Sequence, residues 1–169
     1  MKRPIARAAA AAATAAALVV PMAATGALPA FGTAGVTLTG NGHDSQLYSV
    51  SAAKHPTFDR VVFRFRFGVP RVDARYVTKV LHDGSGLPVA LKGNRYLEVA
   101  MQMVHTDATA GHPTNVPMVL TPLLPMLRQL KQSGDFEGVV SYGFGLKAKN
   151  GYRVFRLSHP TRVVIDFKH

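Results

Sequence analysis

Two acidic residues lie close together in the segment GDFEG, residues 134–138, and their spacing is the most suggestive of catalysis in the chain. Residues two apart on a β-strand point to the same side, with Cα atoms about 6.6 Å apart. Asp135 and Glu137 could then serve as the two carboxyl groups of a glycoside hydrolase. The flanking glycines instead favour a turn next to a strand, where Asp135 accepts hydrogen bonds from backbone amides. We therefore expect no catalytic residue, and a small secreted wall-glycan hydrolase using Asp135 and Glu137 is the alternative.

A second polar group, formed by His105, Asp107 and His112, falls in an irregular stretch that contains Gly and Pro. Imidazole and carboxylate suit zinc, but this spacing does not match the ligand pattern of a metal motif. The sequence has no G-x-S-x-G elbow and no P-loop, and without cysteine it has neither thiol chemistry nor disulfides. We expect neither a metal nor another cofactor.

Arginines are the most prominent polar residues on the expected strands. Arg64 and Arg66 share one face of a strand, and three further residues, Arg75, Arg153 and Tyr142, lie on strands that could neighbour it. A guanidinium group pairs with carboxylate or phosphate, and a tyrosine ring can stack on a sugar. These five residues form the predicted binding surface; an ordinary solvated sheet face is the alternative.

The first thirty residues have the layout of a secretory signal peptide. Three basic residues, Lys2, Arg3 and Arg7, precede an apolar run over 8–20, and small residues follow Pro21. The run is too short for a membrane-spanning helix, which needs about 20 residues. We expect cleavage after Ala24, Ala27 or Ala30, a flexible lead-in over 31–47 and one domain over 48–169. Without cysteine, a lipid anchor is excluded, so the mature protein should be secreted with no stable membrane anchor.

The charge of the chain is strongly positive, at +11. Without the three basic residues of the leader, seventeen basic residues remain against nine acidic ones, or about +8. Such an excess attracts polyanions over long distances. An exported protein rarely meets nucleic acid, so the phosphodiesters and carboxylates of a cell envelope are the expected partners. A charge that serves solubility alone stays open, as does the oligomeric state.

Alternating hydrophobicity predicts an all-β fold. Over 60–67, Val61, Phe63, Phe65 and Phe67 share the face expected to be buried, and the arginines share the other. Further strands are expected at 36–39, 47–51, 71–77, 89–91, 96–103, 138–146, 152–157 and 162–167. These segments predict a sandwich or open barrel of about eight to ten short antiparallel strands.

Two local features bear on the arrangement of these strands. Leucines over 123–130 fit a short helix opened by Pro122, but Pro125 favours a strand over 126–132. Asn150-Gly151 separates two strand-like runs and is typical of a type I′ hairpin turn. We expect a strand in the first place and a hairpin in the second.

The segment HPTFDRVVFRFRF, residues 55–67, resembles the final segment HPTRVVIDFKH, residues 159–169. In the second segment Val163, Ile165 and Phe167 share one face, as the aromatic residues do in the first. An internal repeat, with one such strand in each half of a sandwich, would explain the similarity. Convergence on the pattern of any half-buried strand is the alternative.

Three phrases resemble the AMIN-like domain of secreted and lipid-anchored actinobacterial proteins: FDRVVFRF (58–65), GDFEGVVSYGFGL (134–146) and TRVVIDF (161–167). DGSG (83–86) and LEVAM (97–101) fall where that family has a turn and a central strand. The resemblance covers about residues 48–169, and the Asp-Phe-Glu-Gly phrase is its most specific part. An alanine-rich leader and a preference for arginine over lysine are typical of a bacterium with a high genomic GC content.

The resemblance implies a function. The family is named after the AMIN domain, a β-sandwich that binds peptidoglycan and helps to hold envelope enzymes at the wall. We therefore expect a secreted, non-catalytic domain that contacts a cell-wall polymer, either peptidoglycan or an anionic glycan. Besides the hydrolase, a protein–protein interaction module that pairs a sheet edge with a partner chain is an alternative.

Overall fold

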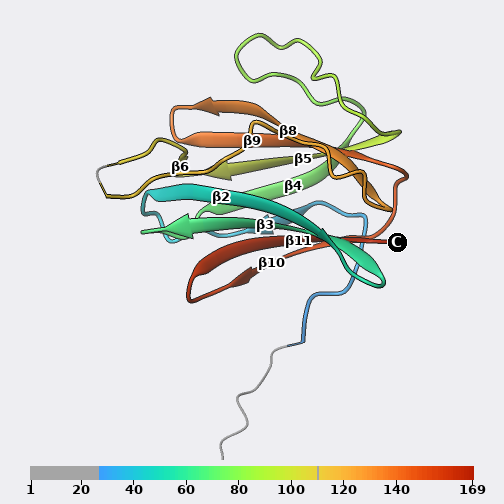
Figure 1. The fold of residues 1–169 in the computed structure, drawn as a ribbon, viewed down its shortest axis with the longest axis horizontal. Helices are drawn as coiled ribbons and strands as arrows, with labels where there is room; N and C mark the ends of the chain where they lie inside the picture. The colour runs from blue at the N-terminus through green and yellow to red at the C-terminus, as the bar shows by residue number, and fades with distance from the viewer. Residues whose placement is uncertain (1–26, 110) are drawn as a thin grey trace, which may run out of the picture.

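The computed structural model describes residues 27–109 and 111–169, and within them the chain is all-β (Figure 1). Residues 1–26, which make up most of the predicted signal peptide, lie outside the described residues. In this described part, eleven strands, one more than the upper end of the prediction, form two sheets packed face to face. The predicted sandwich is confirmed.

The six-stranded sheet has the order β1-β4-β5-β9-β8-β7, with strands β1 (Val36–Leu38), β4 (Arg71–Val77), β5 (Arg95–Gln102), β9 (Val139–Leu146), β8 (Leu127–Phe136) and β7 (Val119–Leu120). The five-stranded sheet has the order β10-β11-β3-β2-β6, with strands β10 (Tyr152–Leu157), β11 (Thr161–Lys168), β3 (Phe58–Arg66), β2 (Ser45–Lys54) and β6 (Val104–His105). All pairs between these strands are antiparallel except β2 with β6. The strand expected over 126–132 is present as β8. β1 lies within the expected lead-in and pairs with β4.

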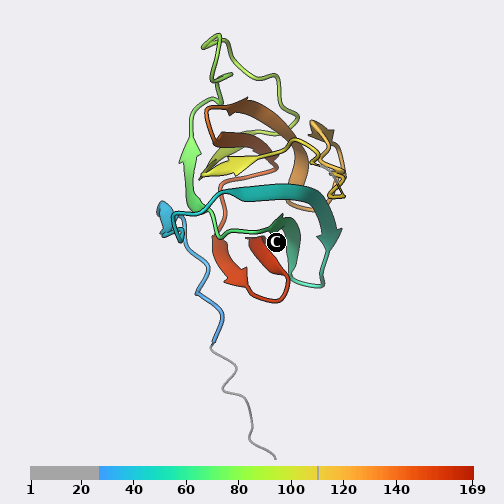
Figure 2. The same cartoon turned by 90° about the vertical axis from the view of Figure 1, so that its left-hand side faces the viewer.

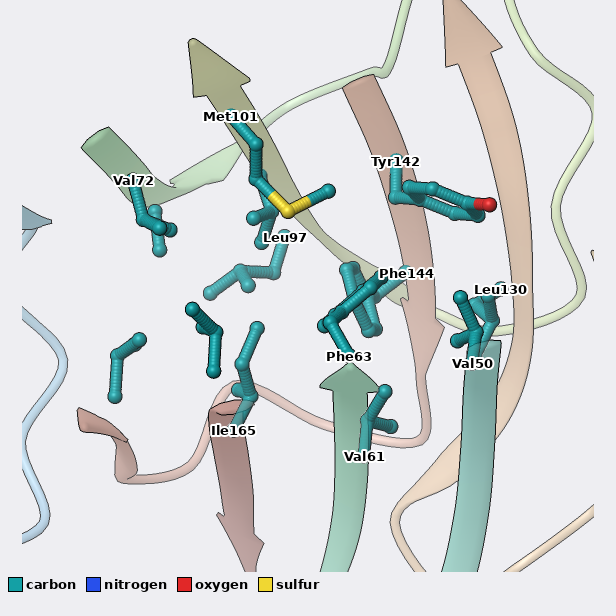
Figure 3. Close-up of a cluster of buried hydrophobic side chains, with 14 of the residues drawn as sticks. Val50, Val61, Phe63, Val72, Leu97, Met101, Leu130, Tyr142, Phe144 and Ile165 are labelled. Carbon is teal, nitrogen blue, oxygen red and sulfur yellow. The ribbon is translucent and has the colours of Figure 1, made fainter. Parts of the chain in front are cut away.

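The alternating pattern of β3 places its aromatic side chains in the core between the sheets. Phe63 is fully buried and contacts the rings of Tyr142 and Phe144 from the opposite sheet (Figure 3). Phe65, Ile165 and Phe167 belong to the same core, as the alternation predicts. The expected inward position of Phe67 is wrong: β3 ends at Arg66, the backbone turns at Phe67 with φ of 71°, and this ring is 66 % exposed.

The residues Asn150-Gly151 do not form the predicted hairpin. They connect β9 of the six-stranded sheet to β10 of the five-stranded sheet, and neither residue has a positive φ. The main-chain oxygen of Asn150 accepts a hydrogen bond of 2.6 Å from the Tyr76 hydroxyl, and its side chain donates to the main-chain oxygen of His169. The expected strand over 89–91 is also missing, since only an isolated bridge joins Leu81 to Pro88 there.

The two similar segments are neighbours in one sheet instead of equivalents in two halves. β3 and β11 pair antiparallel with Val62 opposite Val164, so equivalent residues are related by a local two-fold axis at this pair. Each His-Pro-Thr phrase lies at the turn of a hairpin, before β3 in one case and before β11 in the other. The similarity therefore describes two hairpins that place their second strands side by side.

The segment between β4 and β5, residues 78–94, covers the outer face of β9, on the far side from the five-stranded sheet (Figures 1 and 2). Two glycines of β9 allow this approach. A Cβ atom at Gly143 would lie 2.8 Å from Val80, and one at Gly145 would lie 2.1 Å from the Lys92 carbonyl oxygen. Both faces of β9 are consequently buried.

A tyrosine connects the edges of the two sheets at β1 and β10. Tyr152 and Gly32 exchange two backbone hydrogen bonds of 2.8 and 3.0 Å. The Tyr152 hydroxyl lies 2.7 Å from the Ala34 carbonyl oxygen and 2.9 Å from that of Ala74. Burial raises the pKa of Tyr152 to about 12, which keeps the hydroxyl protonated as a donor.

Among residues 27–109 and 111–169, no helix is long and apolar enough to span a membrane.

Candidate binding surface

The outer face of the five-stranded sheet carries the arginines that alternate with the core residues. Its strands run in the order β10, β11, β3 and β2, so side chains of equal register form rows across the sheet. A middle row consists of Phe155, Val164 and Val62, and arginine rows lie on both sides of it. These two arginine rows differ in their partners.

The first row is a closed ion-pair cluster around Asp166. Arg60 binds this carboxylate through two hydrogen bonds of 2.7 and 2.9 Å, and Arg153 binds it at 2.7 Å. Asp166 is fully buried, and its hydrogen bond raises the pKa of Arg60 above the ordinary value. Arg153 also stacks 4.4 Å from the centre of the Phe31 ring. Arg153 shares the single carboxylate of Asp166 with Arg60 and therefore has a structural role, and its predicted role in binding a ligand stays a prediction.

The second row places two arginines opposite each other without an acidic partner. Arg64 and Arg162 are direct cross-strand partners in β3 and β11. Arg64 donates to the Ser51 hydroxyl at 3.0 Å, and Arg162 donates to the Pro160 carbonyl oxygen at 3.2 Å. Within the described part of the chain, neither guanidinium has a carboxylate within 4.0 Å. Like charges directly opposite each other are unfavourable, and a bound carboxylate or phosphate would relieve the repulsion.

Arg66 lies next along β3 and holds a loop. Its guanidinium donates to the Gln46 side chain at 2.9 Å and to the Pro113 carbonyl oxygen at 3.0 Å, and it stacks 4.0 Å from the centre of the Tyr48 ring. Pro113 belongs to the loop between β6 and β7. Arg66 therefore belongs to the predicted surface but is committed to positioning this loop.

Arg75 and Tyr142 do not belong to this surface. Arg75 lies on β4 in the other sheet and forms an ion pair of 2.8 Å with Glu98. Tyr142 is fully buried in the core, so its ring cannot stack on a ligand as predicted. Burial, followed by the charge of Asp135, raises the pKa of Tyr142 above its ordinary value. The pattern of β9 shows the reason, because its large residues share one face and its small residues, Ser and Gly, share the other.

The acidic pair of the GDFEG segment is divided between a strand and a turn. Asp135 lies on β8, where its Oδ2 accepts hydrogen bonds from Thr106 and Gln132. Glu137 is in the two-residue turn to β9, with φ of 48°, followed by Gly138 with φ of 74°. The assumption that both carboxylates point the same way from one strand is therefore wrong, and the geometric argument for a hydrolase loses its basis.

The three residues considered for zinc are divided between a strand and a loop, with His105 on β6 and Asp107 and His112 in the loop that follows. The main-chain oxygens of Asp107 and His112 accept hydrogen bonds from Gln46, and the His112 ring packs on Phe67. Among the residues that the structure describes, no group of three or more His, Cys, Asp or Glu side chains is placed to hold a metal ion.

Of the five predicted binding residues, Arg64 and Arg66 lie together, and the sequence analysis missed their neighbour Arg162. Its outward position follows from the alternation in β11, but its place beside Arg64 depends on a pairing between strands about a hundred residues apart. The similarity of the two segments could have indicated this pairing. When the two copies pair about a two-fold axis, the first arginine of one copy, Arg162, lies opposite the charged residue near the end of the other, Arg64.

The described residues form an all-β sandwich with two arginines opposite each other on one sheet face. The family model of the AMIN-like domain matches residues 45–169, so the chain belongs to this family. Searches of curated proteins and of solved structures gave no match. Membership suggests a cell-wall-related binding module and an extracellular protein of the cell envelope.

Proposed function

We propose that the protein is a secreted, non-catalytic module that binds an anionic cell-wall polymer through Arg64 and Arg162. The observation that carries the proposal is the cross-strand arginine pair, which has no acidic partner among the described residues. Family membership and the positive charge of the whole chain support the same conclusion.

The two arginine rows of this sheet face differ in their acidic partners. Two arginines that serve the stability of the fold, Arg60 and Arg153, share a buried carboxylate. The same sheet leaves Arg64 and Arg162 side by side on the other side of the apolar row. Both guanidinium groups can donate paired hydrogen bonds to one phosphate or carboxylate group.

Retention on purified cell wall tests the proposal. In the double variant Arg64→Gln/Arg162→Gln, retention at low salt should fall at least about tenfold, because each charged hydrogen bond contributes about 1.5–3 kcal/mol. Retention of the unaltered protein should fall steeply with added salt, since the Debye length shrinks from about 10 Å at 0.1 M to about 3 Å at 1 M.

The control variant Arg75→Gln/Lys147→Gln removes the same charge from β4 and from the residue that follows β9, and it should retain most of the binding. Arg66→Gln is a poor probe, because it would also release the loop held at Pro113. The proposal would be contradicted if retention on cell wall changed neither with added salt nor in the double variant Arg64→Gln/Arg162→Gln. Release of reducing ends from the wall, abolished by Glu137→Gln, would favour the hydrolase instead.

The secreted state rests on the predicted signal peptide. Mass spectrometry of the culture supernatant should find a chain that begins between residues 25 and 31. An intact Met1 on membrane-bound protein would show that the leader is retained.

A further inference from the structure

A cleft of about 560 Å³ lies beside the end of β8 in the six-stranded sheet, and neither Arg64 nor Arg162 is among its lining residues. Its walls are the end of β8, the loop between β6 and β7, and the turn after β4, with the side chains of His82, Thr106, Asn115, Gln132, Ser133 and Asp135 among its lining. We propose that this cleft binds an uncharged saccharide unit. The inference does not depend on the proposed function of the arginine pair.

The loop wall of the cleft is fixed before any ligand binds. Gln46 is fully buried, and its amide donates to the main-chain oxygens of Asp107 and His112 at 2.9 and 3.2 Å. Backbone hydrogen bonds of 2.8 Å join Asn115 to Tyr48 and Gln132 to Met118. A ligand would therefore meet a formed site with little ordering cost.

One wall contains a hydroxyl group that lacks a partner. Ser133 is 4 % exposed, and its Oγ has no hydrogen-bond partner among the described residues. Burying a hydroxyl without a partner is unfavourable. This Oγ is closed to solvent as the side chain stands, and a rotation about χ1 would bring it into the cleft, where a ligand can supply the missing bond. Ser133 sits at an irregularity in the pairing of β8 with β9, between Gln132 and Gly134, which sets it apart from the regular ladder.

A carboxylate beside Ser133 is held in place and still has an unused oxygen. Oδ2 of Asp135 accepts hydrogen bonds from Thr106 and from Gln132, the latter at 3.0 Å. Its Oδ1 accepts none from the residues that the structure describes. A carboxylate is an acceptor only, so Oδ1 is suited to a ligand hydroxyl or amide N–H.

The charges around the cleft argue against an anion. A second carboxylate, that of Asp83, packs so closely on Gly134 that a Cβ atom there would lie 1.9 Å from its Oδ2. Asp135 lines the cleft beside neutral amide and hydroxyl groups, Asp83 lies behind Gly134, and both carboxylates repel phosphate or carboxylate ligands. Vicinal hydroxyl and acetamido groups of a neutral sugar match these donors and acceptors, and Val116 and Met118 offer apolar contact for a ring face.

Amide NMR titration of the purified protein tests the inference with two neutral disaccharides, N,N′-diacetylchitobiose and cellobiose. At least one should give saturable shifts at residues 131–136 and 114–118. Ser133→Ala should weaken this binding about 2- to 10-fold through the loss of one hydrogen bond. The same variant should raise the thermal unfolding midpoint, because the unpartnered hydroxyl is removed.

Ser45→Ala is the matched control, because Ser45 is fully buried, its Oγ also lacks a partner in the described chain, and it does not line the cleft. It should raise the midpoint in the same way and leave disaccharide binding unchanged. Arg64→Gln/Arg162→Gln should also leave it unchanged, so a failure of the proposed function is distinguishable from a failure here.

Absence of shifts at these amides with both disaccharides would overturn the inference, as would unchanged affinity in Ser133→Ala. Tighter binding of chitobiose, the cationic counterpart without acetyl groups, would also overturn it, because the cleft would then select a cation through Asp135.

Discussion

Single carboxylates connect parts of this domain that are distant in sequence. Asp59 is fully buried on β3, and its Oδ2 accepts backbone N–H groups of Met126 and Leu127 at 2.6 and 2.8 Å. Its Oδ1 lies 2.8 Å from the ring of His169. Asp59 thereby joins the start of β8 in one sheet to the other sheet. Asp166 has a comparable role among the arginines of the outer face.

Asp73 gives a test at the residue scale. The Thr37 hydroxyl of β1 donates to its Oδ1 at 2.6 Å, and this bond, together with Arg71, lowers the pKa of Asp73 below 3.8. A lowered pKa means that the ionised form stabilises the fold above pH 3.8 and that this contribution disappears as the pH falls through the folded value. NMR titration should place the Asp73 inflection below 3.8, and Thr37→Val should move it upward. An inflection unmoved by Thr37→Val would mean that Arg71 dominates.

At the scale of elements, the turns show what a local pattern can and cannot predict. Asn150-Gly151 has the residues of a hairpin turn, but its flanking strands belong to different sheets. The turn with two positive φ values is Glu137-Gly138, between β8 and β9. The first central position of a type I′ turn favours Asn, Asp or Gly. With Glu137 at this position, the sequence does not predict a type I′ hairpin here.

Glu137→Asn should therefore stabilise the protein by up to about 1 kcal/mol, because asparagine tolerates the left-handed backbone better than glutamate. Urea unfolding measures the gain. Glu137→Val, a β-branched residue at the same φ, should destabilise it. Equal stability of the two variants would show that this backbone is not strained.

The strands themselves were predictable because alternation is local. The bounds of β4 and β10 agree with the expected 71–77 and 152–157. Pairing between distant strands was not predictable, and the site depends on it. Arg162 lies beside Arg64 because β3 and β11 pair. Arg153 forms an ion pair with Asp166 because β10 and β11 pair. The cleft could not be predicted from the sequence, because its walls come from three segments that are far apart in the chain.

At the scale of the whole molecule, Tyr152 joins the two sheets along one side, and its hydroxyl reaches carbonyl oxygens at both Ala34 and Ala74. Tyr152→Phe should reduce the free energy of unfolding by about 1–2 kcal/mol, the cost of losing the hydrogen bond that this buried hydroxyl donates.

Tyr142→Phe is the comparison for this change. Its ring is equally buried, but its hydroxyl lies 3.4 Å from the Pro117 carbonyl oxygen, near the limit for a hydrogen bond. Its loss should cost less than about 1 kcal/mol. If urea unfolding gives equal losses for the two variants, the Tyr152 hydroxyl does not secure the two sheets.

Arg66 stands between the two surfaces proposed to bind ligands. It follows Arg64 on the same face of β3, and it holds Pro113, which directly precedes the Thr114 and Asn115 wall of the cleft. A polymer with both anionic and neutral sugar units would be held at two points of one continuous surface. The second contact would then form at an effective concentration in the millimolar range, and avidity for an intact wall would exceed the affinity for a soluble fragment by about 10²-fold or more. Weak binding of each small ligand and firm retention on the polymer are therefore compatible in this protein.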